Sequence, residues 1–238
     1  MRKPLYFIIL LIIFFAAIPV SAQGDIRVKC NNITMNVFSE NTHCYQTKEN
    51  NPVPADAQPE ALASAQVANT TIYMSDLESF GNGIDPQVTF YLFDDLMKTS
   101  FSLLNPVMNL RDIIENLGSG DITLDSITMP VPLLPVQIKE QTAAVLPQLI
   151  DFESGSGLRT VIAFTDPISS GMGSTELYYS WQGVTSDNTY YISAIFPLVN
   201  TNLNGKPAAG ADLLNANSSD FQPSLDQLDY FIRSIVIE

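Results

Sequence analysis

The sequence predicts an α+β fold in which a twisted antiparallel sheet is built from hairpins and a C-terminal amphipathic helix packs on one face. From residue 147 onward, runs of β-branched and aromatic residues alternate with short turn-forming sequences, a pattern typical of paired strands. Residues 223–238 instead match a helix. Ser224 and Gln227 match a capping box, and an apolar stripe at helical spacing follows, formed by Leu225, Leu228, Phe231, Ile232 and Ile235.

The N-terminus has the layout of a secretory signal peptide. Arg2 and Lys3 precede an uncharged apolar run over residues 5–20, and small residues follow at Ser21 and Ala22. The alternative is an uncleaved membrane anchor, but the run is shorter than the roughly 20 residues that span a bilayer. We therefore expect residues 1–22 to be removed and the mature chain to be secreted or extracytoplasmic, with no membrane contact after cleavage.

The charge balance excludes several classes of partner. The chain has 11 basic and 25 acidic residues and a net charge of −14, which becomes −16 when the two basic residues of the signal segment are lost. Such a molecule is repelled by nucleic acid and by anionic membranes. Ca²⁺ is an alternative partner of carboxylates, but Asn215, Asn217 and Asp220 depart from the EF-hand spacing. We predict no metal site and no cofactor.

The two cysteines, Cys30 and Cys44, predict a disulfide in an oxidising compartment. Such a bridge contributes about 3 kcal/mol by restricting the unfolded chain. A metal site that uses both thiolates and His43 is the alternative, but a fourth ligand is missing nearby. The bridge closes an N-terminal segment over residues 23–48, read as two short strands around a turn. A Pro-rich linker (49–60) and one α+β domain (61–238) follow.

The first half of that domain gives softer patterns. In order, they predict a short helix at 60–68, a strand at 69–74, a loop at 81–87, a strand at 88–96, a helix at 109–121 and an extended Pro-rich stretch at 128–136. Gly118 is the expected left-handed cap of the helix at 109–121.

Two hairpins are predicted in the second half. Residues 148–165 read as two strands joined by a turn at Gly155-Ser156-Gly157, because glycine tolerates positive φ. Residues 176–197, "ELYYSWQGVTSDNTYYISAIFP", read as a second hairpin with the turn at Asp187-Asn188.

This aromatic hairpin contains the chain's single tryptophan. The Asp187-Asn188 turn sets Trp181 opposite Ala194 and Tyr179 opposite Phe196, which places the largest side chains on one face and predicts that this face is core. The other face mixes polar and aromatic residues. If no helix covers that face, we predict that four of its residues bind a ligand: Tyr178, Gln182, Tyr191 and Ser193. Arg159 is a fifth candidate.

No catalytic residue is predicted. Ser-His or Cys-His catalysis and zinc hydrolysis need histidines, and the single His43 lies in the disulfide segment. The glycine pairs lack the spacing of phosphate-binding loops. Paired carboxylates for glycoside hydrolysis remain an alternative, with candidates at Asp94, Asp95, Asp151, Glu153 and Glu176.

The stretches "LIDFESGSGLR" and "ELYYSWQGVTSDNTYYISAIFPL" resemble a group of uncharacterised secreted domains from environmental bacteria. The shared pattern is a strand ending in Asp-Phe, a Gly-x-Gly turn, an arginine, an aromatic strand with Gln-Gly, a turn with Asp and a strand ending before Pro. It corresponds here to Asp151, Phe152, Gly155, Gly157, Arg159, Gln182, Gly183, Asp187 and Pro197. The sequence departs from that pattern at Ser154 and Asn188.

More distantly, the order of hairpins and last helix resembles the PsbP/Mog1-like α-β-α sandwich. The resemblance implies an extracytoplasmic setting and an accessory or binding role, without an activity. We therefore expect a secreted non-catalytic binding or accessory domain whose partner is an extracellular glycan or protein. The alternatives are a carboxylate-dependent extracellular hydrolase and an assembly or stabilising subunit of a cell-surface complex.

Overall fold

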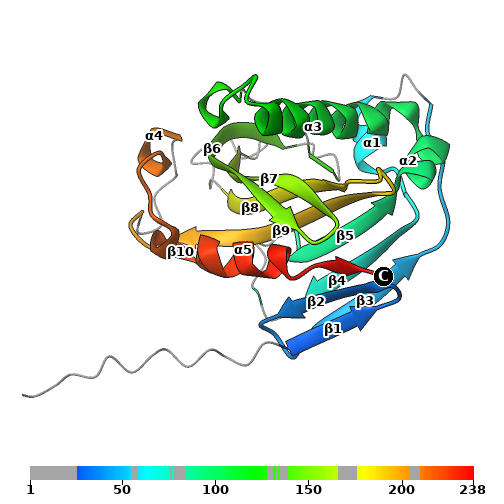
Figure 1. Ribbon diagram of the computed structural model, residues 1–238, viewed down its shortest axis with the longest axis horizontal. Coiled ribbons are helices and arrows are strands. Elements are labelled where there is room, and N and C mark those ends of the chain that lie inside the picture. Colours follow the sequence, from blue (N-terminus) through cyan, green and yellow to red (C-terminus); the bar gives the residue numbers. More distant parts are fainter. Residues whose placement is uncertain are drawn as a thin grey trace, which may run out of the picture.

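The computed structural model describes residues 26–54, 58–75, 77, 84–127, 131, 133–134, 139–165, 176–203 and 210–238 (Figure 1). The expected signal peptide lies outside these residues. The strands are β1 Ile26–Cys30, β2 Ile33–Val37, β3 Thr42–Thr47, β4 Asn69–Met74, β5 Gln87–Leu92, β6 Glu140–Phe152, β7 Gly155–Thr165, β8 Glu176–Thr185, β9 Tyr190–Asn200, β10 Phe221–Gln222 and β11 Val236–Ile237. The helices are α1 Pro59–Ala63, α2 Phe93–Thr99, α3 Phe101–Ser119, α4 Gly210–Leu213 and α5 Leu225–Arg233, with 3₁₀ turns η1 Leu124–Ser126 and η2 Ser218–Asp220.

Two antiparallel sheets account for the strands of the described residues. The larger sheet runs β3-β4-β5-β9-β8-β7-β6, with β10 paired to β9, and the smaller runs β1-β2-β11. Every pairing is antiparallel, so the predicted mixed α+β class with antiparallel sheets is confirmed.

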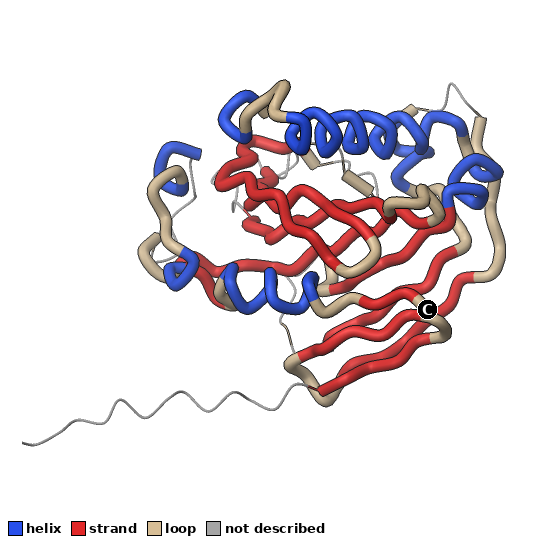
Figure 2. The backbone as a smooth tube through the Cα atoms, viewed as in Figure 1, coloured by secondary structure: helices blue, strands red, loops and turns tan. Residues whose placement is uncertain are grey.

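The large sheet is covered on both faces (Figure 2). Side chains of α3 pack with Leu158, Val184 and Tyr191 on one face. On the other face, α5 and the small sheet pack with Tyr179 and Trp181. The core therefore has two layers, one on each side of the sheet. None of the helices in the described ranges is both long and apolar enough for a membrane span.

The aromatic hairpin has the predicted register. Trp181 pairs with Ala194, Tyr179 with Phe196 and Gly183 with Ile192. Asn188 takes the positive φ, 57°, that the turn requires. The division of this hairpin into two faces is confirmed, and the Trp181 face is core, as predicted.

The turn predicted at Gly155-Ser156-Gly157 is wrong. Phe152 pairs with Gly155, so the turn residues are Glu153 and Ser154, and the glycines already belong to β7. Their small size serves close packing instead. A Cβ on Gly157 would lie 2.5 Å from the Trp181 ring, and one on Gly183 only 2.2 Å from the same ring. The tryptophan thus lies against backbone that only glycine can provide.

Two predicted boundaries in the middle of the chain are also wrong. The strand predicted at 88–96 ends at Leu92, and α2 begins at Phe93, where Asp94 and Asp95 fall in a first turn that favours acidic residues. The helix predicted at 109–121 begins at Phe101 and is capped by Ser100, whose Oγ accepts from the Ser102 amide at 3.3 Å. Its left-handed cap is Gly120, with φ 81°, and not Gly118.

The C-terminal helix is confirmed but shorter than predicted. The Ser224 Oγ accepts from the Gln227 amide at 3.3 Å, and all five residues of the predicted apolar stripe are buried. The helix ends at Arg233, and residues 236–237 form β11, which pairs with β2.

The predicted disulfide between Cys30 and Cys44 is present. It joins the end of β1 in the small sheet to β3 at the edge of the large sheet. The N-terminal segment thus contributes to both sheets. Residues of the predicted linker are hydrogen-bonded to the rest of the chain: the Asn51 amide donates to the Gln66 carbonyl at 2.8 Å, and the Val53 amide to the Thr99 carbonyl at 2.9 Å.

Candidate functional site

Four of the five predicted ligand-binding residues lie on the sheet face that α3 covers. Tyr178, Gln182, Tyr191 and Ser193 are each at most 1 % exposed. The condition attached to that prediction, a face without a covering helix, is therefore not met. Burial raises the pKa of the Tyr191 hydroxyl well above its usual value, which keeps it protonated as a hydrogen-bond donor.

Three of these side chains form one internal network. Gln182 Nε2 donates to Ser193 Oγ at 3.0 Å, and Gln182 Oε1 accepts from the Tyr191 hydroxyl. The Leu134 amide donates to Tyr191 Oη at 3.3 Å, and its carbonyl accepts from Ser193 Oγ. The partner that this polar cluster binds is thus the backbone of Leu134 within the same chain.

The other two predicted residues lie apart from the network. The Tyr178 hydroxyl accepts from the Ile84 amide at 3.0 Å and donates to Glu176 Oε2 at 2.8 Å. Arg159 lies on the opposite face of the sheet, where its Nε is 3.8 Å from Asp229 Oδ1. The structure brings together three of the five residues and leaves Tyr178 and Arg159 at separate places.

A different part of the molecule offers an accessible polar cavity. Near the edge strand β3 there is a hollow of about 440 Å³, within the usual size range of ligand sites. Its lining is dominated by amide and hydroxyl side chains, with aromatic and charged residues beside them. We call it the amide cleft; it is lined by Asn31, Asn32, Gln46, Thr47, Lys48, Ala68, Asn69, Thr70, Phe90, Leu92, Asp95 and Tyr190.

The β1–β2 turn positions the first wall of the amide cleft. Asn31 adopts a φ of 57°, which asparagine tolerates better than most residues. Asn32 Nδ2 donates to the Tyr190 hydroxyl at 3.3 Å and to the Glu238 carbonyl at 3.3 Å. Because the neighbouring Cys30 carries the disulfide, this turn is tied to both sheets.

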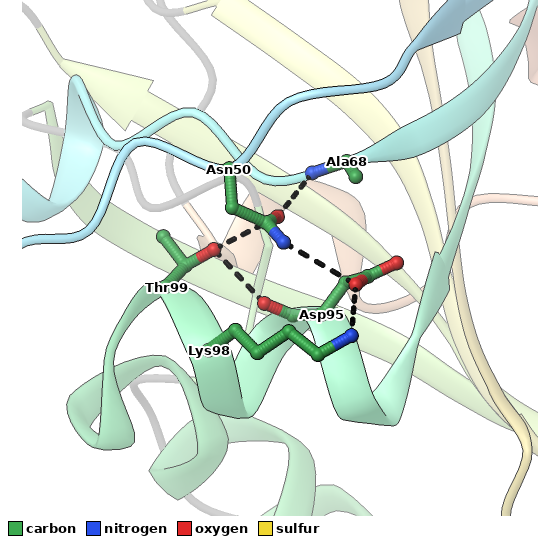
Figure 3. A network of polar contacts seen from close by, with 5 residues as sticks. All are labelled: Asn50, Ala68, Asp95, Lys98 and Thr99. Carbon is green, nitrogen blue, oxygen red and sulfur yellow. Dashed lines mark hydrogen bonds and ion pairs between the residues drawn. The ribbon is translucent and has the colours of Figure 1, made fainter.

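A hydrogen-bond network around Asn50 holds the opposite wall (Figure 3). Asn50 Oδ1 accepts from the Ala68 amide at 2.7 Å and from Thr99 Oγ1 at 3.1 Å, while its Nδ2 donates to Asp95 Oδ1 at 3.2 Å. Lys98 Nζ also donates to Asp95 Oδ1, at 2.9 Å. The network joins α2 to the chain just before β4, and so fixes Ala68 and Asp95 where they line the cleft.

Several polar groups in the cleft are available to a ligand. Within the described part of the chain, the Gln46 amide and the Lys48 ammonium have no side-chain partner, and Asn31 Nδ2 has only a long contact, 3.5 Å, to Thr70 Oγ1. An amide both donates and accepts, and a hydroxyl does the same. The one lining carboxylate, Asp95, is already paired with Lys98. This lining suits a hydroxyl-rich molecule better than an apolar one.

The amide cleft was not predicted from the sequence. Its residues come from six separate segments, and the only local signal was "CNN" at residues 30–32, a turn-forming pair of asparagines between two short strands. No three His, Cys, Asp or Glu side chains in the described ranges are grouped to hold a metal ion. The resemblance to PsbP/Mog1-like domains stays a prediction. Comparisons of the chain with protein-family models, curated proteins and solved structures found no match.

Proposed function

We propose that this protein is a non-catalytic binding protein that works outside the cytoplasm and holds a neutral oligosaccharide in the amide cleft. The observation that carries the proposal is the lining of that cleft, where amides and hydroxyls surround a hollow of about 440 Å³. A site built to hydrogen-bond hydroxyl groups discriminates strongly, because its polar groups are left unpaired by a molecule that lacks them. The Cys30–Cys44 disulfide is compatible with an oxidising compartment.

The aromatic residues of the cleft support the same ligand class. Tyr190 is half-buried, lines the cleft and presents its hydroxyl to Asn32. Amphipathic tyrosines combine contact area with a polar group at low entropic cost, which suits ligands with both apolar and hydroxyl faces.

The hydrolase alternative has less support. The three described cavities, of about 220, 440 and 300 Å³, are each lined by at most one acidic residue. A glycosidase needs two carboxyl groups across the scissile bond. Asp229 has a raised pKa, as a general acid requires, but it hydrogen-bonds to Tyr179 at 2.9 Å and lines none of these cavities.

The test is isothermal titration calorimetry of the full chain against a panel of soluble oligosaccharides, including chitin, cellulose, xylan and mannan fragments. We expect at least one to bind and Gln46→Ala and Asn31→Gly to weaken it by about tenfold each, or about 1.4 kcal/mol. Glycine at position 31 keeps the positive φ and removes only the side chain.

Tyr45→Ala is the matched control. Tyr45 is adjacent to Gln46 on β3, is exposed, and is not one of the residues that line the cleft. Equal losses of oligosaccharide affinity in Gln46→Ala and Tyr45→Ala would contradict binding in the cleft. Cleavage of a bound oligosaccharide during the titration would overturn the non-catalytic role.

A further inference from the structure

A second cavity lies at the opposite edge of the large sheet, between a bulge in β6 and the start of α5. It measures about 300 Å³ and is lined by Leu146, Pro147, Gln148, Arg159, Asp226 and neighbouring residues. The β6–β7 register shifts between Val145 and Gln148, and Leu146 has a φ of 54°, a conformation that costs a non-glycine residue free energy. The bulge lets the edge strand form a wall of this cavity, which we call the bulge cavity.

Arg159 supplies the positive charge of the bulge cavity. The residue is only 7 % exposed, and one guanidinium nitrogen donates to Gln148 Oε1. Its Nε makes no hydrogen bond, because the nearest carboxylate oxygen, Asp229 Oδ1, is 3.8 Å away and accepts from the Tyr179 hydroxyl at 2.9 Å. The charge of a buried arginine is thus only partly compensated, and a carboxylate in the cavity would provide a second, charge-assisted partner.

Asp226 places a negative charge on the same cavity. It is exposed at the start of α5, and its backbone amide donates to Ser218 Oγ at 2.8 Å. The Gln227 amide is also occupied, by Ser224 Oγ at 3.3 Å. Among the described lining residues, Arg159 is the one positively charged donor for a ligand anion, and Asp226 is the one carboxylate for a ligand cation.

Two charges of opposite sign favour a ligand that carries both. The chain has a net charge of −14, so a simple anion is repelled at long range, whereas a zwitterion has no net charge to be repelled. A volume of about 300 Å³ is at the lower end for ligand pockets and limits the ligand to a small molecule. We infer that the bulge cavity binds a free amino acid or a similarly small zwitterion, with its carboxylate at Arg159 and its ammonium at Asp226.

The first test uses the full chain and the twenty common L-amino acids, each titrated while protein NMR spectra are recorded. The strongest binder is then compared with its carboxamide, which lacks the carboxylate, and its N-acetyl derivative, which lacks the ammonium. We expect each derivative to bind about tenfold more weakly or worse. The inference fails if no amino acid binds below about 10 mM, or if either derivative binds as tightly as its parent.

Variants then assign the two ends of the ligand. Asp226→Asn is a surface change, so it should fold; we expect it to weaken the amino acid about fivefold or more and to leave the N-acetyl derivative unchanged. Asp151→Asn is the matched control for the loss of one negative charge. Asp151 is an exposed carboxylate on β6, the strand whose bulge lines the cavity, but it is not itself in the lining. Equal effects of these two variants would overturn the assignment of Asp226.

Arg159→Lys tests the other end of the ligand while keeping the positive charge. Lysine lacks the planar fork of guanidinium, so we expect at least a fivefold loss of affinity in a folded variant. Unchanged affinity would overturn the role of Arg159. Oligosaccharide binding in the amide cleft does not involve these residues, so the two proposals succeed or fail separately.

Discussion

The β8–β9 hairpin and the amide cleft differ in how their residues are arranged along the sequence. The hairpin is one continuous, aromatic-rich stretch that is buried on both faces, and its polar residues bond to the chain's own backbone. The cleft gathers short polar pieces from six segments around an open hollow. In this protein a dense aromatic stretch forms the core, whereas the accessible polar cleft is formed by residues that show no distinctive pattern in any single segment.

The largest effect is expected from Trp181→Ala. The ring is fully buried against Gly157 and Gly183, neither of which has a side chain to occupy the space that the ring leaves. We expect a loss of about 3–5 kcal/mol in the free energy of unfolding, measured by urea denaturation. Tyr45→Ala, an exposed aromatic, should change it by about 0.5 kcal/mol or less. Similar losses of unfolding free energy in the two variants would contradict the assignment of Trp181 to the core and of Tyr45 to the surface.

A smaller loss of stability is expected from Asn50→Ala, which alters the network that holds the amide cleft. The variant removes three hydrogen bonds and leaves the Ala68 amide without its partner, which costs about 1–3 kcal/mol. Amide hydrogen exchange should accelerate at Ala68 and in α2 and not in the hairpin. Asn105→Ala, on the exposed side of α3, is the control. Faster exchange throughout the hairpin would show that the two regions do not respond separately.

The smallest expected effect is a pH dependence of stability that arises where α5 packs on the hairpin, at Asp229. Burial raises the pKa of Asp229, which accepts a hydrogen bond from Tyr179, and this outweighs the opposite influence of the nearby Arg159 charge. A carboxyl whose pKa is higher in the folded than in the unfolded state stabilises the fold increasingly as pH falls through the folded-state pKa. That gain is complete below the unfolded value of about 4.

Asp229→Asn removes this titration. We expect the stability of the variant relative to the wild type to be highest at pH 7 and to fall as the pH is lowered to about 3.5, measured by urea unfolding. Asp151→Asn controls for the loss of one charge. A relative stability of Asp229→Asn that rises toward acid pH would contradict the direction of the pKa shift.

Local sequence was sufficient where one interaction decides the structure. The Asp187-Asn188 turn fixed the hairpin register, the apolar spacing after Ser224 fixed the buried face of α5, and the cysteines formed the predicted bridge. The glycines of β7 misled the turn prediction because their role depends on residues of β8, more than 20 residues away. Gly157 lies against the Trp181 ring and Gly155 against the Val184 carbonyl. The turn propensity of glycine carries no information about such a long-range contact.

The binding prediction depended on tertiary structure in the same way. Gln182, Tyr191 and Ser193 do form a cluster, as their shared face predicted, but whether that face is exposed was decided by α3 and Leu134. The amide cleft depends on six segments meeting in space, and no periodicity or spacing within a single segment specifies such a meeting.

The pairing of β11 with β2 has a consequence for the order of folding. The backbone carbonyl of Asn32, which lines the cleft, accepts a hydrogen bond from the Glu238 amide at 2.8 Å, and Lys29 contacts the Glu238 carboxylate across 209 residues of sequence. Contacts this distant in sequence are slow to form, and a chain made from its N-terminus contains β11 only after every other described strand has been synthesised. The Asn31–Asn32 turn therefore gains its last backbone partner late, and a nascent chain that has already folded its aromatic hairpin still lacks the β11 pairing beside one wall of the amide cleft.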